Sequence, residues 1–498
     1  MMPELVWFKR DLRITDHSPL FAAAKRGKVI CLYIYEPDLI GAEDFSQRHL
    51  LFINESLTEL DHGLRALGSR LLIRCGNAVD VLSGLQEEVG FNCIRAHQET
   101  TNAISYKRDQ AVKKWARSSG IAFIEYRQQG IVRAMASRDG WAKQWQGFVS
   151  SPLVSRPTQV VNGGAELISL GIQSPESFAV KDDGLTSRQT GGESEAINLL
   201  NSFISERSQK YLKGLSSPLT AWDSCSRLSP YLTYGNISLR TVYQRVNQRK
   251  RELQRQRGHR DPWSQSLQNY LERLAWHCHF IQKLEDEPAI EFENMNPAFN
   301  GLRENEFNIA HFEAWAAGRT GFPLIDACMR ALQRTGWINF RMRAMLISFA
   351  SYHLWLHWRQ PALHLARYFT DYEPGIHYSQ IQMQSGTTGI SALRIYSPIK
   401  QVLDQDPEGN FIRQWVPELK NVPNQFISEP HLMSESIQHQ SRCKIGCDYP
   451  APIVDHLSAY RTAQKRMRAA NLAAQASGSS RQVFQRHGSR RNQNRKPI

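Results

Sequence analysis

The chain has 498 residues, 41% of them hydrophobic and 22% charged, a composition typical of a globular protein large enough for two domains. No apolar run approaches the roughly 20 residues that cross a bilayer. The N-terminus also lacks the pattern of a secretory leader, so we expect a cytoplasmic protein with no membrane contact.

The net charge of +14 favours a polyanionic partner, of which nucleic acid is the commonest. Six of these positive charges lie between residues 481 and 496, where there is no acid. The remainder of the chain still carries +8, so the excess is not confined to the C-terminus.

Residues 1–132 alternate between strand-like and helix-like segments. Apolar runs that predict strands lie at 4–8, 29–37, 69–76, 92–97 and 121–127. Amphipathic segments that predict helices lie near 46–67, 77–88 and 100–119. This alternation predicts an α/β domain with a doubly wound parallel sheet. No G-x-G-x-x-G follows the first strand, so a Rossmann dinucleotide site is not supported.

The rest of the chain divides into three further regions. Residues 133–190 are rich in Gly, Ser, Pro and Asp, which predicts an interdomain connector on the surface. Residues 191–470 lack strand signals and show one helical segment after another, which predicts an all-α domain. Residues 471–498 are rich in Ser, Gly, Asn and Arg, so we expect a disordered basic tail.

The stretch 334–389 is the most unusual part of the helical region, because its apolar turns carry charges such as Arg343, Asp371 and Glu373. Buried charges must be paired or bound to a ligand, and an interior Arg343–Asp371 ion pair is one interpretation. The acidic turn also contains Gly, His, Tyr and Gln and leads into a Gly/Thr loop. That mixture favours a pocket for a large polar aromatic ligand.

A second candidate site is SCSRLSP at 224–230, where a helix begins after a loop. Free N–H groups, hydroxyls and the helix dipole favour phosphate at such a position, although N-capping by serine is the simpler explanation. Tyr211, upstream, is either a core residue or a ligand contact.

No metal site is expected. The eight cysteines are scattered, as is typical of reduced thiols, and Cys443 and Cys447 have no second pair nearby. His277, Cys278 and His279 are adjacent on a predicted helix. Their side chains point about 100° apart and cannot converge on one ion.

Five ordered segments resemble the photolyase/cryptochrome flavoprotein family. They are VWFKRDLRITDH near the N-terminus, SRLSPYLTYGNIS at 226–238, TGFPLIDACMRALQRTGW at 320–337, EGNFIRQWVPEL at 408–419 and YPAPIVDH at 449–456. The similarity covers about residues 4–470. It implies an α/β antenna domain joined to a helical domain that holds FAD. A second antenna chromophore, of folate or deazaflavin type, is left open.

The resemblance also implies roles for individual residues. The FAD phosphates would be contacted by Cys225, Ser226, Arg227, Leu228 and Ser229. The flavin and ribose would be surrounded by Trp337, Arg343, Asp371 and Glu373. Trp276 matches the residue that stacks on a flipped lesion, followed by His277 where Arg is common. Arg341 and Arg394 match residues near the DNA backbone, and stacking plus phosphate neutralisation is what binding an extruded base requires.

Several positions depart from the family pattern. Trp358 fits the middle of the electron-transfer chain, but Ile381 stands where the flavin-proximal Trp is usual, and no Trp lies near Asn305 at the distal position. Photoreduction would therefore need another route, for which the candidates are Trp355, Tyr368 and Tyr378.

The expected lesion pocket is altered as well. Arg273 stands where a proton-donating Glu is common, and Asn339-Phe340 replaces the His-Asn or His-His pairs of repair enzymes. His377 aligns opposite flavin N5, where a titratable imidazole could gate flavin protonation near neutral pH.

The family resemblance nevertheless implies a monomeric carbon–carbon lyase, similar to deoxyribodipyrimidine photolyases, that repairs pyrimidine dimers in DNA by blue-light-driven electron transfer from reduced FAD. Which dimer is repaired stays open. One alternative is a cryptochrome-type photoreceptor with the same fold and FAD, which the altered Trp chain and lesion pocket favour. Another is a flavin-free helical nucleic-acid-binding protein.

Overall fold

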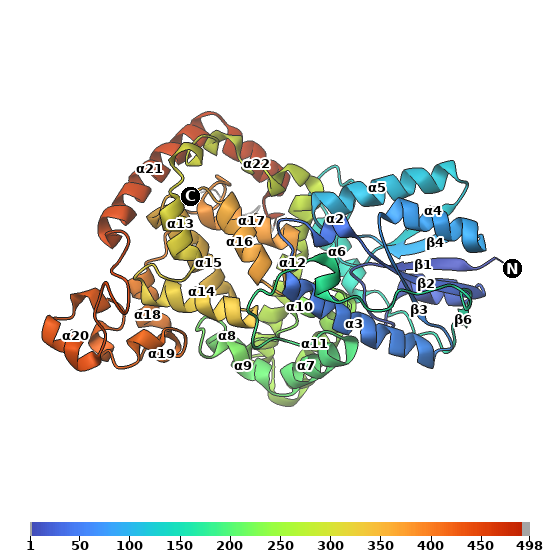
Figure 1. Ribbon diagram of the computed structural model, residues 1–498, viewed down its shortest axis with the longest axis horizontal. Helices are drawn as coiled ribbons and strands as arrows, with labels where there is room; N and C mark the ends of the chain where they lie inside the picture. The colour runs from blue at the N-terminus through green and yellow to red at the C-terminus, as the bar shows by residue number, and fades with distance from the viewer. Residues whose placement is uncertain (1, 491–498) are drawn as a thin grey trace.

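The computed structural model describes residues 2–490, in which an α/β domain and a larger helical domain lie side by side (Figure 1). The N-terminus lies at the outer end of the α/β domain, and the last helices arch over the helical domain. This arrangement confirms the predicted fold class.

The α/β domain is built on a parallel sheet with the strand order β3-β2-β1-β4-β5 and a short β6 beside β2. The strands are β1 Glu4–Phe8, β2 Lys28–Tyr35, β3 Leu71–Cys75, β4 Cys93–His97, β5 Ala122–Tyr126 and β6 Val161–Asn162. The first five confirm the predicted strands, with ends that differ by at most two residues. The strand order reverses between β1 and β4, the kind of position where open α/β sheets bind ligands.

Helices cover both faces of this sheet. They are α1 Ser18–Ala24, α2 Pro37–Ile40, α3 Gln47–Ala66, α4 Ala78–Val89 and α5 Ala103–Ser118. Successive strand side chains point to opposite faces, so Leu5 and Trp7 pack in one core with residues of α4 and α5, whereas Val6 and Phe8 pack in another.

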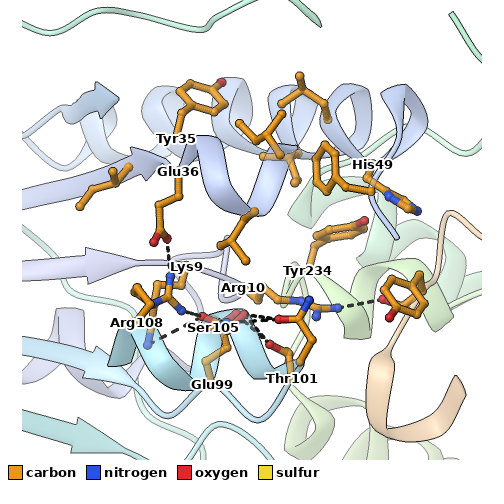
Figure 2. Close-up of a pocket in the computed structure, with 18 of the residues that line it drawn as sticks. Lys9, Arg10, Tyr35, Glu36, His49, Glu99, Thr101, Ser105, Arg108 and Tyr234 are labelled. Carbon is orange, nitrogen blue, oxygen red and sulfur yellow. Dashed lines mark hydrogen bonds and ion pairs between the residues drawn. The ribbon is translucent and has the colours of Figure 1, made fainter. Parts of the chain in front are cut away.

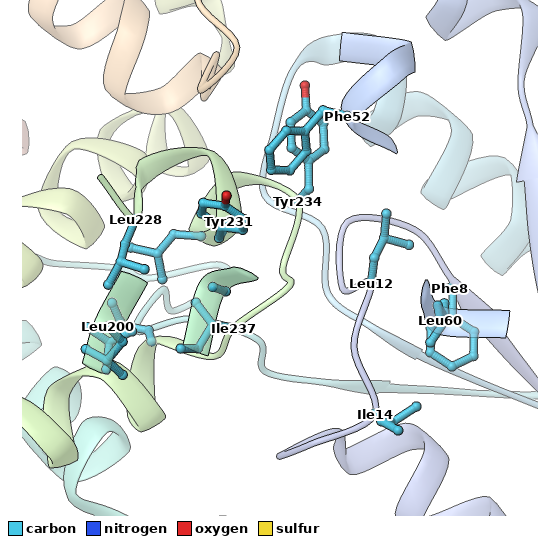
Figure 3. Close-up of a cluster of buried hydrophobic side chains, with 14 of the residues drawn as sticks. Phe8, Leu12, Ile14, Phe52, Leu60, Leu200, Leu228, Tyr231, Tyr234 and Ile237 are labelled. Carbon is cyan, nitrogen blue, oxygen red and sulfur yellow. The ribbon is translucent and has the colours of Figure 1, made fainter. Parts of the chain in front are cut away.

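The core behind Val6 and Phe8 continues into the helical domain. Figure 3 shows Leu12 and Phe52 of the α/β domain near Tyr231 and Tyr234, and all four belong to one buried cluster. The two domains therefore share a continuous hydrophobic core, which fixes their relative position and everything that lies between them.

The helical domain contains α7 to α22, and a π-helical turn at Phe349–His353 follows α15. The bounds are α7 Glu193–Ser205, α8 Tyr211–Gly214, α9 Ala221–Ser224, α10 Ser229–Thr233, α11 Leu239–Arg257, α12 Pro262–Asp286, α13 Ile309–Ala316, α14 Pro323–Thr335, α15 Phe340–Ser348, α16 Arg359–Tyr368, α17 Pro374–Ser385, α18 Pro398–Gln405, α19 Asn410–Trp415, α20 Glu435–Ser441, α21 His456–Ala476 and α22 Ser479–His487.

Two regions differ from the sequence prediction. The connector 133–190 contains β6 and a helix, α6 Trp141–Ser150. Its buried residues Trp141, Trp145 and Val149 recur at the helical spacing of four, a signal that the overall composition concealed.

The predicted disorder of 471–498 was wrong for the residues that the structure describes. Helix α21 runs to residue 476 and α22 follows it, with Val483 and His487 buried. Alanine-rich segments are good helix formers, and these two side chains attach the second helix to the domain. Residues 491–498 lie outside the described part. Within residues 2–490, no helix combines the length and apolarity that crossing a membrane requires.

Candidate functional site

A cavity with about 1330 Å³ of empty space lies inside the helical domain, between α8, α12, α15 and α17. It brings together most of the residues predicted to bind the cofactor. Those that line it are Tyr211, Cys225, Ser226, Arg227, Ser229, Trp337, Arg343, Asp371 and Glu373. Leu228 does not line it: its side chain is fully buried in the shared core, so only its backbone is available to a ligand.

Arg227, at the cavity, has an unusual backbone conformation and a guanidinium held between aromatic rings. Its φ of +60° is uncommon for a residue other than glycine and marks a constrained position. Its guanidinium lies 3.2 Å from the ring centre of Trp222 and 4.2 Å from that of Trp337, and it donates hydrogen bonds to Gln189.

No carboxylate of the described residues lies within ion-pair distance of Arg227. Burial lowers the pKa of this guanidinium to about 9. A buried cation without an anion is costly, whereas a bound phosphate would supply the missing charge and the hydrogen bonds that a guanidinium prefers. The turn at 226–229 therefore has the properties of an anion site.

Arg343 and Asp371 form the ion pair that the sequence predicted. Two parallel hydrogen bonds of 2.9 Å join the guanidinium to the carboxylate, and a third from Arg343 reaches the carbonyl of Ile338. The guanidinium also lies 4.1 Å from the ring centre of Phe369. Because this pair is fixed from several directions and lines the cavity, it presents a rigid, polarising wall to a ligand.

Glu373 lies beside this pair at the start of α17. Burial raises its pKa to about 7, against the opposing charge of Arg10, whose Nη2 lies 3.3 Å from Oε2. Its other oxygen, Oε1, is buried and has no hydrogen-bond partner among the described residues. Asn339 and Gln380 line the same cavity, and Asn339 Oδ1 and Gln380 Nε2 are likewise buried without a hydrogen-bond partner among the described residues. Buried polar atoms are normally satisfied, so these three fit a ligand that carries both donors and acceptors.

The proposed gating role of His377 meets a difficulty. The side chain lines the cavity, but burial lowers its pKa to about 4 and its Nε2 donates to the carbonyl of Ala362 at 2.9 Å. The imidazole is therefore neutral at pH 7, so a change of its charge near neutral pH, as expected from the sequence, is not supported.

A second, wider hollow with about 2750 Å³ of empty space adjoins the cavity and shares Phe340, Gln380 and Gln384 with it. We call it the Trp276 groove. Trp276 and Arg394 line it, and Trp276 is 43% exposed. Arg273 lines the inner cavity and stacks on Trp276, with its guanidinium 4.6 Å from the ring centre.

The sequence predicted that His277 lies beside Trp276 at the lesion site, but His277 does not line the groove. Adjacent residues of a helix point about 100° apart, so His277 faces the inner cavity, where burial lowers its pKa to about 4. Arg341 lines neither space, and its buried Nε has no hydrogen-bond partner among the described residues.

Trp358 is fully buried away from both spaces and donates to Asn294 Oδ1 at 2.7 Å. Tyr378 packs against it at a ring-centre distance of 6.3 Å, and the Tyr378 hydroxyl accepts a 3.2 Å hydrogen bond from the hydroxyl of Tyr372. Tyr372 in turn lines the inner cavity. Ile381, which stands where the flavin-proximal Trp was expected, also lines the cavity.

Two family models match this chain: DNA photolyase over residues 4–144, and the FAD-binding domain of DNA photolyase over residues 270–469. The chain belongs to the photolyase/cryptochrome family. The match to an FAD-binding domain argues against the flavin-free alternative. The inner cavity is the candidate site for this cofactor, and we call it the FAD cavity. Its unpaired Arg227 and orphaned polar atoms fit that cofactor.

The relatives of this family member include both repair enzymes and receptors. A deoxyribodipyrimidine photo-lyase of Alkalihalophilus pseudofirmus is 26% identical, over 91% of this chain and 95% of its own. The cryptochrome of Synechocystis has a TM-score of 0.82 at 26% identity, over 93% and 99% of the two chains. An archaeal photolyase of Sulfolobus tokodaii, solved with two FAD molecules, has a TM-score of 0.74 at 26% identity, over 94% and 100%.

This photolyase/cryptochrome protein has another hollow, with about 830 Å³ of empty space, at the carboxyl ends of β1, β2 and β4 (Figure 2). Its upper wall combines aliphatic side chains with aromatic ones such as Tyr35 and His49, whereas its floor is charged. Tyr372 lines both this hollow and the FAD cavity. We call it the α/β hollow.

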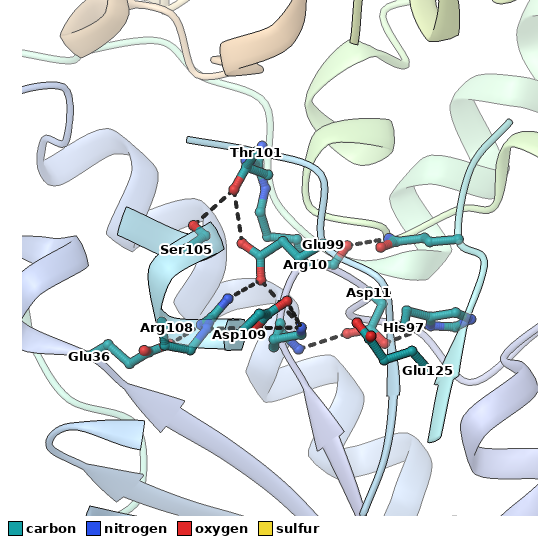
Figure 4. Close-up of polar contacts among 12 residues, drawn as sticks. Arg10, Asp11, Glu36, His97, Glu99, Thr101, Ser105, Arg108, Asp109 and Glu125 are labelled. Carbon is teal, nitrogen blue, oxygen red and sulfur yellow. Dashed lines mark hydrogen bonds and ion pairs between the residues drawn. The ribbon is translucent and has the colours of Figure 1, made fainter. Parts of the chain in front are cut away.

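The charged floor is a closed network of ion pairs (Figure 4). Lys9 Nζ lies 2.9 Å from Asp109, and Arg108 binds Glu36, Glu99 and Asp109. Burial alone would raise the pKa of Glu99, but Arg108 and Lys9 hold it below its ordinary value. This network was not predicted from the sequence, because Lys9 lies 100 residues from Asp109 and Glu36 lies 72 residues from Arg108.

The family member also contains one group of potential metal ligands within residues 2–490, made of Asp11, His17 and His97. His17 Nδ1 accepts a hydrogen bond from the Leu20 amide, so its Nε2 carries the proton and donates to Asp11 at 2.9 Å. His97 Nδ1 lies 2.7 Å from the same oxygen. Burial would raise the pKa of Asp11, but these hydrogen bonds hold it well below its usual value. With His17 committed to two hydrogen bonds, the group is explained as a buried polar cluster.

Proposed function

We propose that this protein repairs pyrimidine dimers in DNA by blue-light-driven electron transfer from reduced FAD, acting as a cytoplasmic monomer. The observation that carries the proposal is the adjacency of two spaces. The FAD cavity and the Trp276 groove share three lining residues, and Arg273, which lines the cavity, stacks on Trp276 in the groove. A base stacked on Trp276 would lie next to the cofactor.

Bound FAD would supply the excited electron, which returns after the dimer opens, so no net reductant is consumed. The protein's own residues bind and orient. Arg227 would hold the phosphates and the Arg343–Asp371 pair would fix the ring system, while Trp276 would stack on the extruded dimer. Arg394 would contact the DNA backbone from the groove.

The missing proximal Trp calls for another route by which electrons reach the cavity. Of the three candidates, Tyr378 alone has ring contacts, within residues 2–490, with both Trp358 and a residue of the cavity wall. Tyr368 lies against Arg48 and His364, and Trp355 lies between Arg303 and Arg466. We therefore favour a Trp358–Tyr378–Tyr372 route.

The α/β hollow would hold the antenna chromophore. Its position at the ends of the strands and the aromatic side chains of its wall suit a flat aromatic ligand, and the shared Tyr372 would place that ligand beside the FAD cavity. The Sulfolobus photolyase, with its second FAD described as a light-harvesting cofactor, supports this proposal.

A repair assay tests the main proposal. Protein with reduced FAD is incubated with a duplex containing a single cyclobutane dimer or a single (6-4) product, in blue light and in the dark. We expect light-dependent loss of one of the two lesions. If neither lesion is lost although both bind, the repair function is rejected.

A cryptochrome-type photoreceptor is the second candidate. Ile381 in the cavity wall and Arg273 in place of a proton-donating Glu favour it, because both changes affect positions used in photoreduction and repair. Light-induced flavin reduction without lesion loss, accompanied by a change in susceptibility to proteolysis, would support this function instead.

A further inference from the structure

We propose that residues 479–490, which lie beyond the family match that ends at 469, form a wall of the Trp276 groove and bind the phosphate backbone of the DNA. This inference rests on the proposed function, since it extends the surface that holds the lesion-containing duplex.

Helix α22 and the residues that follow it are fixed in place by polar contacts with two other elements. His487 Nε2 lies 2.5 Å and Arg486 Nη1 3.2 Å from Glu287, directly after α12, and Arg490 Nε lies 2.8 Å from Asp139, before α6. Val483 and His487 are buried beneath the helix. The red helices that arch over the helical domain in Figure 1 thus end on elements that also line the groove.

The segment borders the groove and leaves it open. Phe484, His487 and Arg490 line the same hollow as Trp276, which keeps about 2750 Å³ of empty space with α22 in place. Phe484 is 49% and Trp276 43% exposed. A lid that blocks the site would cover Trp276, so the geometry favours a wall that contacts a bound duplex.

The charge of the groove selects an anionic partner. The cations that line it are Arg138, Lys250, Lys283, Arg394 and Arg490, against the single acid Glu272. Arg481 and Arg486 are exposed on α22, and the sequence continues with Arg491, Arg495 and Lys496. Clustered cations beside a groove with an exposed Trp suit a nucleic-acid backbone with an extruded base.

Binding measured in the dark with the flavin-loaded protein tests this inference. The probe is a duplex with one dimer, compared with the same duplex undamaged, across a range of salt concentrations. One variant ends at residue 478. A second, Asp139→Asn with Glu287→Gln, keeps every cation but removes the carboxylates that dock α22. The control is Lys420→Gln with Lys444→Gln, two exposed cations near α19 and α20, far from α22 in Figure 1.

Truncation should reduce the salt slope of binding by about 1.8 if two phosphate contacts are lost, which weakens binding on the order of 30-fold at 0.15 M salt. The docking variant should also weaken dimer binding, although its net charge rises by two. If binding depended on net charge alone, that variant would instead bind the duplex more tightly. Unchanged flavin absorbance verifies that each variant is folded, and the control should keep the wild-type slope.

An unchanged slope after truncation, or tighter binding by the docking variant, overturns the inference. Tighter dimer binding by the truncated protein would identify the segment as an inhibitory lid, which also overturns it. If the full chain binds dimer-containing and undamaged duplex equally, the repair function fails, whereas the slope on undamaged duplex still decides the role of the segment. If the full chain binds neither duplex, both proposals fall.

Discussion

The two ligand spaces on either side of Tyr372 are built on opposite principles. In the α/β hollow, Lys9, Glu99 and Arg108 satisfy one another, and no buried side-chain polar atom of its lining lacks a hydrogen-bond partner in the described chain. In the FAD cavity, no carboxylate of residues 2–490 pairs with Arg227, and none of their hydrogen-bond donors reaches Glu373 Oε1. Buried charge is costly unless compensated.

This difference indicates which ligand the fold depends on. A network that is complete by itself is stable with the hollow empty, so an antenna chromophore is optional for folding. Unpaired groups around the FAD cavity make the cofactor part of the structure, since binding to the native state alone stabilises it. Each prediction below tests one side of this comparison.

The largest effect is expected in the α/β hollow. Glu99→Ala leaves Arg108 and Lys9 undercompensated in a buried site, so the free energy of unfolding should fall by about 3–5 kcal/mol, as for other broken buried pairs. FAD content should stay unchanged, because Glu99 does not line the FAD cavity. Urea unfolding and flavin absorbance measure the two quantities. Loss of FAD together with stability would show that the two spaces are not independent.

Glu373 should make the FAD-free protein less stable as pH rises. Burial raises its pKa from the ordinary 4.5 to about 7, so between these values the native state binds more protons than the unfolded state. Stability is then lost as pH increases, by about 3 kcal/mol in total at 1.36 kcal/mol per unit. Glu373→Gln should remove this loss in urea unfolding at pH 5 and pH 8.

Glu291 provides the matched control, since burial also raises its pKa to about 7 but it lies outside the FAD cavity. Adding FAD should suppress the pH dependence due to Glu373, because a donor to Oε1 favours the charged form, and leave that due to Glu291. Equal behaviour of the two residues with and without FAD contradicts the assigned contact.

Arg227→Met should separate ligand binding from stability. Losing a charged hydrogen bond to phosphate costs about 1.5–3 kcal/mol, so the Kd for FAD should rise about 10- to 150-fold. The FAD-free protein should change by less than about 1 kcal/mol, because removing a buried charge offsets the lost stacking on Trp222 and Trp337. FAD titration and urea unfolding of the same preparations decide this; destabilisation without loss of FAD affinity would make Arg227 a core residue.

These outcomes also show what the sequence could reveal. The five strands and the Arg343–Asp371 pair were predictable, because alternation and charge in an apolar turn are local signals. The Lys9–Asp109 pair and the contact of Arg10 with Glu373 join distant segments, so no local pattern contains them. His277 was assigned with Trp276 although their helical positions separate them, and α6 was concealed by the polar residues around Trp141 and Trp145.

Trp276→Ala should have the smallest effect on the stability of the protein and should weaken the binding of dimer-containing DNA selectively. Base–aromatic stacking contributes about 1–3 kcal/mol, so dimer-containing duplex should bind about 5- to 150-fold more weakly, while undamaged duplex and FAD bind as before. Trp222→Ala is not a suitable control because it contacts Arg227; Trp415→Ala, outside both spaces, is suitable. Equal weakening for both duplexes would place Trp276 outside the lesion site.

The central claim is that a lesion in the Trp276 groove reaches the FAD cavity closely enough to accept an electron. Flavin fluorescence of the fully reduced protein measures this most directly, since electron transfer shortens the excited-state lifetime. We expect a shorter lifetime with dimer-containing duplex and an unchanged one with undamaged duplex. An identical lifetime with saturating amounts of both duplexes would contradict the claim.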